Sequence, residues 1–313
     1  MSLFQLGTGT PAFPSIVSGT DRAGAPIGWG ALGALSAVPG KRDQLYSVTD
    51  AAYSQTRILT IDTKRTPAVI TGALPVRDAA GAPVGYDAEG VFARPQGGFW
   101  LAVEGATGAQ NKLVRLDAAG VTRQTVALPA EVAAGLGKQG LEGVTATTDR
   151  QGREIVWVAV QRELSTDPAG IVRLGRYDVA AGTWSWFGYR LGATSVPGDW
   201  MGLSEITVVG DRLAVIERDK LNGPAATVKR IYTVPLPGAA ATGPLTVLPK
   251  SLAVDVLPAL RATNGWTQEK LEGLTVAGNG EVYAITDNDA VQDATGETVL
   301  LRLGSSRKVF GHR

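Results

Sequence analysis

The sequence predicts an all-β protein, a β-propeller built from four-stranded antiparallel blades. The first observation is a short motif of an apolar residue, a carboxylate and a glycine that recurs along the 313 residues. The second is that each copy leads through a turn into an apolar run that ends in a polar or acidic residue, as in Val103-Glu104. The third is the supply of turn formers, 40 glycines and 17 prolines. A unit of four short strands repeated at a fixed length is typical of propeller blades.

Five copies of this unit can be counted. They begin near residues 33, 88, 141, 203 and 271. We therefore expect five blades in a single domain over residues 1–313, and six blades are the alternative if the N-terminal stretch contributes more. Residues 1–28 are too few for a blade, so we expect from them one strand that closes the ring against residues 298–310.

Each unit continues beyond the motif hairpin with two further short segments that are rich in β-branched residues or alternate in polarity. In chain order these predicted strands are 57–62 and 68–71, 112–117 and 124–128, 171–178 and 184–187, 229–234 and 245–248, and 298–303 and 308–310. Helix is scarce, and residues 129–134, with proline in the first turn, form the best helical candidate.

The composition excludes several kinds of site and partner. No cysteine is present, and the single histidine, His312, is next to last, which excludes thiolate chemistry and argues against a His-based triad or zinc site. A bound metal would therefore have oxygen ligands, which favours Ca²⁺, with Mg²⁺ as the alternative. A net charge of +1 provides no field that would attract nucleic acid. No apolar run reaches the ~18 residues of a membrane span.

The recurring carboxylates are expected to converge in space. In an antiparallel hairpin the start of the first strand lies beside the end of the second, which brings Glu89 and Glu104 to the same rim. The same argument pairs Glu142 with Gln161, Glu205 with Glu217, and Glu272 with Asp287. If the first strand of each unit is innermost, these rims surround one mouth of the central channel. The alternative is structural: a carboxylate of the motif only accepts backbone N–H groups of the neighbouring blade.

Five motifs in order resemble the phytase-like family, also described as "esterase-like activity of phytase", over roughly residues 29 to 303. They are Gly33-Ala34-Leu35…Thr49-Asp50, Asp87-Ala88-Glu89-Gly90…Val103-Glu104-Gly105, Gly140-Leu141-Glu142-Gly143-Val144, Ile216-Glu217-Arg218 and Glu272-Gly273-Leu274…Thr286-Asp287-Asn288. The resemblance implies a β-propeller hydrolase with ester or phosphoester substrates that is secreted or periplasmic, although no signal peptide is visible. Gln161 stands where the family has an acid.

These observations lead to a Ca²⁺-dependent hydrolase of phosphoric or carboxylic esters, a monomer that acts on a small molecule. The expected metal ligands are Asp50, Glu89, Glu142, Glu205, Glu272 and Asp287. Glu104 or Glu217 is expected to act as general base. The side chains expected to bind the anionic substrate are Arg218, Lys270 and Lys138. Two alternatives stay open: a non-enzymatic exported propeller with a structural cation, and a lactonase-like propeller.

Overall fold

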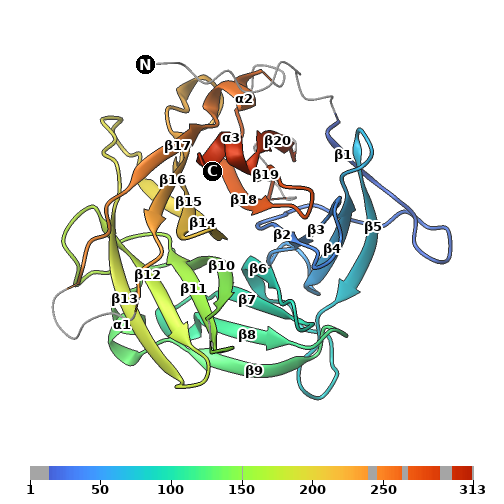
Figure 1. Cartoon of the computed structure of the whole chain (residues 1–313), viewed down its shortest axis with the longest axis horizontal. Coiled ribbons are helices and arrows are strands. Elements are labelled where there is room, and N and C mark those ends of the chain that lie inside the picture. Colours follow the sequence, from blue (N-terminus) through green and yellow to red (C-terminus); the bar gives the residue numbers. More distant parts are fainter. Residues whose placement is uncertain (1–13, 150, 239–244, 263–266, 290–297, 312–313) are drawn as a thin grey trace.

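Five small sheets stand around a central axis and form a five-bladed β-propeller, as predicted (Figure 1). This computed structural model describes residues 14–149, 151–238, 245–262, 267–289 and 298–311. His312 lies outside the described residues. None of the helices within those ranges is long and apolar enough to cross a membrane.

The blades follow one another in chain order. The first contains β1 (Ile16–Ser18), β2 (Ser36–Ala37), β3 (Gln44–Val48), β4 (Arg57–Asp62) and β5 (Ala68–Pro75), and the second contains β6 (Asp87–Ala93), β7 (Phe99–Glu104), β8 (Lys112–Leu116) and β9 (Thr122–Ala127). The third contains β10 (Leu141–Thr148), β11 (Glu154–Val160), β12 (Ile171–Asp178) and β13 (Thr183–Arg190). The fourth contains β14 (Met201–Val209), β15 (Arg212–Asp219), β16 (Lys229–Pro235) and β17 (Ser251–Asp255), and the fifth, within the described residues, β18 (Lys270–Val276), β19 (Glu281–Asp287) and β20 (Leu300–Ser305).

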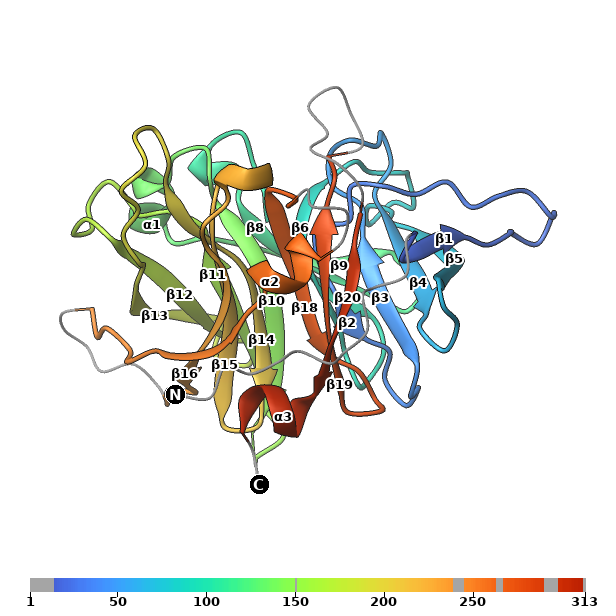
Figure 2. The same cartoon turned by 90° about the horizontal axis from the view of Figure 1, so that it is seen from above.

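Helices are short and connect or flank the strands. They are η1 (Gly108–Gln110), α1 (Ala130–Gly135), η2 (Gly223–Ala225), α2 (Leu257–Arg261) and α3 (Ser306–Phe310). The helix predicted over 129–134 is therefore confirmed as α1. In the edge-on view, α3 lies on one face of the ring, and α1, which precedes β10, lies toward the other (Figure 2).

The first strand of each motif hairpin is innermost, as expected. β2, β6, β10, β14 and β18 contact one another around the ring and line the central channel. Glycine in the motif permits this close approach, because a Cβ at Gly90 would lie 2.6 Å from the carbonyl oxygen of Glu142 in the next blade. Each of the last four inner strands also has a β-bulge at the motif. A bulge changes the direction of a side chain, so the motif encodes where its acid points.

Apolar packing between neighbouring blades holds the ring together. Five buried clusters occupy the five interfaces between blades. The cluster that joins the last blade to the first includes Tyr283 and Ile285 on one side and Leu45 and Leu59 on the other. The ring is therefore closed by side-chain burial, which contributes about 25 cal/mol per Å² of apolar surface removed from water.

The predicted closing strand pairs with a different partner. β1 forms, but it pairs in parallel with β5 at the outer edge of the first blade rather than with residues 298–310. The link to the last blade is a side chain: Ser15 Oγ accepts the N–H of Leu300 at 2.9 Å. Packing of β18 against β2 already closes the ring, so no blade has to combine strands from both ends of the chain.

Two predicted outer strands are also wrong. Residues 308–310 belong to α3, whose Val309 packs between the fourth and fifth blades. Residues 245–248 do not complete their own blade, since β17 does so. Instead Val247 forms a parallel bridge with Gly188 of β13, at the edge of the third blade. A short apolar run predicts an extended segment but does not say which sheet edge it joins.

Candidate functional site

Strand pairing aligns the blades residue by residue at the channel mouth. In the second blade Asp87 pairs with Glu104, two residues before the bulge at Glu89, and in the fifth Lys270 pairs with Asp287, two residues before Glu272. We call the partner at the end of the second strand the rim residue. The rim residues of the five blades are Asp50, Glu104, Gln161, Arg218 and Asp287.

The fourth blade departs from the expected alignment by one residue. Its bulge falls at Ser204, and Gly202, two residues earlier, pairs with Arg218. Glu205 therefore occupies the position that is glycine in the second, third and fifth motifs, and Glu217 lies one residue before the rim. Because successive side chains of a strand point to opposite faces, this offset sends both carboxylates away from the predicted positions.

Glu217 is buried between the third and fourth blades, not at the mouth. It accepts hydrogen bonds from Tyr189 Oη at 2.6 Å and from the N–H of Gly192 at 2.9 Å, and it forms an ion pair with Lys250. Glu217, one of the two residues expected to act as general base, therefore lies away from Glu104. Its role here is to satisfy buried donors.

Glu205 matches the structural alternative rather than the metal ligand that was expected. It accepts the N–H of Ile206 at 2.9 Å and that of Leu274 in the next blade at 3.5 Å. A Cβ at Gly143 would lie 2.0 Å from its Oε1, so this carboxylate packs directly against the motif glycine of the third blade. Burial raises the pKa of Glu205 well above its usual value, and backbone donors oppose that shift.

Four of the other predicted acids fall into two groups of three carboxylates. In what we call the Asp87 triad, one carboxylate oxygen each of Asp87, Glu89 and Glu104 lies within 4.8 Å of the others. In the Asp50 triad the same holds for Asp50, Asp287 and Asp289. The sequence left open whether Asp287-Asn288-Asp289 is a metal-binding turn or an Asx turn, and it did not point to Asp87, which lies two residues before a predicted acid.

The charge of Glu272 acts on most of the predicted groups at this mouth. Burial has the largest effect on the pKa of each of these groups. The negative charge of Glu272 in addition raises the pKa of Asp50, Glu89, Glu104, Glu142, Arg218, Lys270 and Asp287. All of these except Glu104 were predicted as metal ligands or substrate-binding residues, and Glu104 was the predicted base. Lys138, by contrast, is exposed before β10 and makes no ion pair with these acids in the described parts of the chain.

The electrostatic environment favours protonated carboxyl groups unless a cation is present. Burial raises the pKa of Glu104 to about 7, with Asp87 and Glu272 adding to it and the N–H of Gly140 opposing it. Burial likewise raises the pKa of Asp50 to about 6. For Glu142, burial and the nearby charges of Glu104 and Glu272 raise the pKa well above its usual value. Crowded acids of this kind are a mark of functional sites.

Two basic side chains reach into the mouth. Arg218 is 2% exposed and donates from Nη2 to Glu272 Oε1 at 2.7 Å. Lys270 donates to Asp287 Oδ2 at 3.4 Å and also to Asp289. Within the described residues, the buried Nε and Nη1 of Arg218 and Oε2 of Glu272 have no hydrogen-bond partner. Buried polar atoms are rarely left unpaired, so these three point to a ligand.

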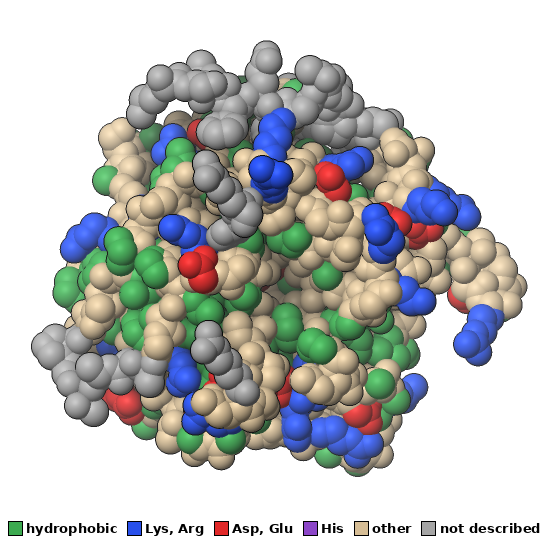
Figure 3. All heavy atoms as spheres, viewed as in Figure 1, with side chains coloured by type: hydrophobic (Ala, Val, Ile, Leu, Met, Phe, Trp, Pro, Cys, Tyr) green, Lys and Arg blue, Asp and Glu red, His purple; other side chains and the backbone are tan. Residues whose placement is uncertain are grey.

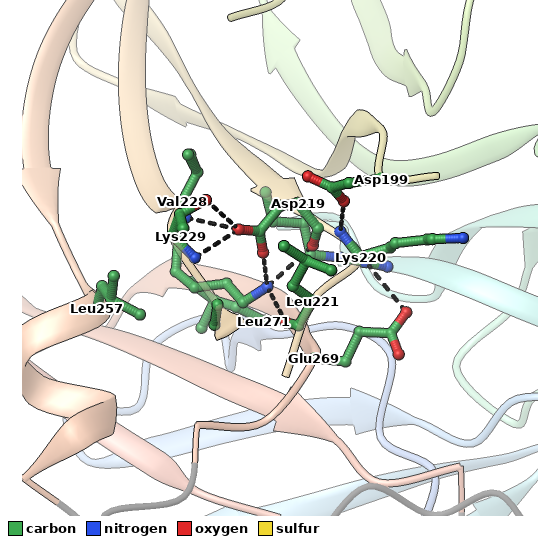
Figure 4. A network of polar contacts seen from close by, with 12 residues as sticks. Asp199, Asp219, Lys220, Leu221, Val228, Lys229, Leu257, Glu269 and Leu271 are labelled. Carbon is green, nitrogen blue, oxygen red and sulfur yellow. Dashed lines mark hydrogen bonds and ion pairs between the residues drawn. The ribbon is translucent and has the colours of Figure 1, made fainter. Parts of the chain in front are cut away.

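A fully buried ion pair supports the strand that carries Arg218. Asp219 follows it directly and accepts the N–H of Val228 at 2.8 Å as well as the ammonium group of Lys229, with both charged side chains 0% exposed (Figure 4). Glu269 approaches from the other side, 3.9 Å from Arg218 Nη1. The face of the ring that carries α3 shows both basic and acidic side chains scattered over it (Figure 3).

In the presence of a chelator, the protein is expected to lose stability as the pH rises from about 4 to 8. The folded-state pKa values of Asp50 (about 6) and Glu104 (about 7) exceed the usual 3.8 and 4.5, so in this window the folded protein binds more protons than the unfolded chain. The free energy of unfolding then falls as pH rises through the folded-state values. Thermal unfolding in EDTA should give a Tm at least about 5 °C lower at pH 8 than at pH 5.

Added Ca²⁺ should reduce that loss, because a cation favours the ionised carboxylates. A Tm in EDTA that stays constant or rises over the same pH window would show that these acids are not held with raised pKa values.

Comparisons with known proteins agree with this fold. A family model described as "Phytase-like: Esterase-like activity of phytase" matches residues 27–290. No curated protein matches the sequence significantly. Among solved structures, a thermostable family-43 glycoside hydrolase is similar, with 12% identity and a TM-score of 0.51 over 88% of this chain and 90% of that chain. The arabinanase Arb43A of Bacillus subtilis has 12% identity and a TM-score of 0.45 over 87% and 94%.

At 12% identity, the family-43 glycoside hydrolase, with a TM-score of 0.51, shows the fold alone. The family model, in contrast, covers most of the chain and all five motif hairpins up to Asn288. The chain therefore belongs to the phytase-like family, the family described as having the esterase-like activity of phytase.

Proposed function

We propose that this protein is a hydrolase of phosphoric or carboxylic esters that acts at the acidic channel mouth with a bound divalent cation. The observation that carries the proposal is the buried Arg218 guanidinium, whose Nε and Nη1 lack hydrogen-bond partners in the described structure while carboxylates surround it. An anionic ester oxygen fits donors of this kind, and Arg offers them in a planar fork. The family's description supports the reaction class.

The residues at the mouth fit Ca²⁺. Every available donor is an oxygen, which is the ligand that Ca²⁺ and Mg²⁺ prefer. Two oxygens bound to one Ca²⁺ at about 2.4 Å can be at most about 4.8 Å apart. The oxygens of each triad lie within 4.8 Å of one another, which is compatible with a shared Ca²⁺. Mg²⁺, with bonds of about 2.0–2.1 Å, needs oxygens no more than about 4.2 Å apart.

Arg218 and Glu142 have the most direct roles in the proposed reaction. Arg218 binds an anionic oxygen of the substrate and stabilises the charge that develops on it. Glu142 belongs to neither triad and is buried beside Arg218, whose charge lowers its pKa against the effect of burial. It removes a proton from the attacking water and returns that proton to the leaving alcohol. A bound cation would supply Lewis acidity and further favour the ionised form of Glu142.

Removal of the cation is expected to abolish turnover. With p-nitrophenyl phosphate and p-nitrophenyl butyrate as probes, EDTA should lower the rate at least about 100-fold, since metal-ion catalysis supplies several kcal/mol of charge stabilisation. Excess Ca²⁺ should restore it. Equal rates with and without the chelator would end the proposed metal role. Activity on a lactone with none on either probe would favour the lactonase-like alternative.

No turnover on any of these probes, together with retained Ca²⁺ binding, would favour the non-enzymatic alternative with a structural cation. Export from the cell, a monomeric state and a small-molecule substrate stay predictions.

A further inference from the structure

The indole of Trp200 lies beside the Arg218 guanidinium at the channel mouth. Trp200 is the last residue of the loop between β13 and β14, and its side chain is partly buried. Arg218 Cζ lies 5.7 Å from the centre of the indole ring, and Cζ of Arg162, from the third blade, lies 4.8 Å from it. A guanidinium within about 6 Å of an aromatic ring is attracted to it. Trp200 therefore contacts the group to which the proposed function assigns the substrate anion.

Two local features hold the indole in this place. Gly202 pairs with Arg218 across the hairpin, and a Cβ at Gly202 would lie 2.8 Å from Trp200 Cζ3, so the lack of a side chain there makes room for the indole. Asp199, directly before Trp200, accepts the N–H of Lys220 at 3.2 Å (Figure 4). This hydrogen bond ties the loop to the end of the strand that carries Arg218.

The protein itself makes few polar contacts with Arg218. Nη2 donates to Glu272 Oε1 at 2.7 Å, and within the described residues Nε and Nη1 have no hydrogen-bond partner. One hydrogen bond leaves the guanidinium free to turn about that contact, whereas stacking against an aromatic ring restricts its plane. Trp200 therefore supplies the contact that orients the unpaired donors.

Glu269 is a competing acceptor for one of these donors. Its Oε1 lies 3.9 Å from Arg218 Nη1, which is too far for a hydrogen bond. Without the indole, attraction between the two charges would draw the guanidinium toward this carboxylate until a charge-assisted hydrogen bond forms. Nη1 would then no longer be available to a substrate anion.

We propose that Trp200 is a positioning residue for Arg218: its indole holds the guanidinium away from Glu269, so that Nε and Nη1 stay free for an anionic oxygen of the substrate. This inference rests on the proposed role of Arg218, but not on a bound cation or on the identity of the general base. Trp200 lies outside the repeated motif, so the repeat does not mark it.

The test is the binding of inorganic phosphate and of butyrate, the acids that the two ester probes release, measured by isothermal titration calorimetry. In EDTA at about pH 5, Asp50 and Glu104 are largely protonated, because burial raises their pKa values to about 6 and about 7. Trp200→Ala should weaken binding of the preferred anion about 10-fold, whereas Trp200→Phe, which keeps an aromatic face, should stay within about threefold. Arg218→Lys should lose at least as much as Trp200→Ala.

Glu269→Ala separates positioning from packing in a double-mutant cycle. In the wild-type background it only removes a nearby negative charge, so anion affinity should rise less than about threefold. In the Trp200→Ala background it also removes the competing acceptor, so affinity should rise at least about fivefold. The matched control is Trp184→Ala, since Trp184 is another partly buried indole, stacked on Trp186 in β13. It should lower the Tm and leave anion affinity unchanged.

Three results would overturn the inference: an unchanged anion affinity in folded Trp200→Ala or Arg218→Lys, an equal gain from Glu269→Ala in both backgrounds, or no binding of either anion to the wild-type protein. Tm measurements show which variants are folded. Anion binding that depends on Trp200, without hydrolysis of any probe, would leave this inference standing while the proposed function fails. Hydrolysis with an anion affinity that Trp200→Ala does not change would do the reverse.

Discussion

A Glu142→Gln variant is expected to lose about 10²–10⁴-fold in turnover on phosphoric or carboxylic ester probes, the range of a general base. The amide keeps the size of the side chain and its hydrogen-bonding capacity but does not accept the proton of the attacking water. Glu142 is 2% exposed among like charges, so removing its charge should leave the Tm in EDTA unchanged or raise it. The loss should appear in kcat, with Ca²⁺ binding retained.

Glu217→Gln is the informative control for this experiment. Like Glu142, Glu217 is a buried glutamate, and it directly precedes Arg218 in the sequence. Its partners Tyr189 and Lys250, however, lie between blades. This variant should lose stability, because Lys250 loses its charged partner, and keep the turnover of its folded fraction. If kcat is unchanged in Glu142→Gln, the general base is one of the two residues predicted from the sequence, Glu104 or Glu217. If only Glu217→Gln loses turnover, the base is Glu217.

Lys229→Met is expected to destabilise the protein by about 3–5 kcal/mol, the usual effect of breaking a buried ion pair from one side. Asp219 would keep its hydrogen bonds from Thr227 and Val228 but would have no counterion, at 0% exposure. The carbonyl of Leu221, which accepts from the ammonium group at 2.9 Å, would also lose its donor. Thermal and urea unfolding measure the loss, and the Tm should fall by roughly 10 °C.

The double variant Asp219→Asn/Lys229→Met provides the matched comparison. It removes both charges, so it should recover a large part of the stability that Lys229→Met loses, as a double-mutant cycle would show. If the single and double variants are equally unstable, the effect comes from packing rather than from an unpaired carboxylate. Because Asp219 directly follows Arg218, kcat of the folded single variant also reports whether this pair positions the guanidinium.

The repeat in the sequence was sufficient to predict the fold and most of the site. A motif that recurs five times implies a ring of similar units, and hairpin geometry places the start of one strand beside the end of the next. From this alone Glu89 and Glu104 could be placed together, and so could Glu272 and Asp287. The structure confirms five blades and brings these carboxylates to one channel mouth.

The fourth blade shows where the motif was insufficient. Leu203-Ser204-Glu205-Ile206 contains a glutamate, and Glu217 ends the next apolar run, so both matched the expected pattern. The pairing register instead puts Ser204 at the bulge and Arg218 at the rim. A strand has a period of two, and a shift of one residue exchanges its two faces, so a pattern that is off by one still looks correct in sequence.

The sequence by itself determined that acidic residues from separate blades surround one opening, because repetition and chain connectivity impose it. Only the tertiary structure decided which acids face the opening and which basic groups lie among them. It places Arg218 and Lys270 among the acids, whereas Glu205 accepts backbone N–H groups instead. Those outcomes depend on bulges, register and contacts between blades that are distant in sequence. No local pattern encodes such contacts, since each is set by what the neighbouring blade presents.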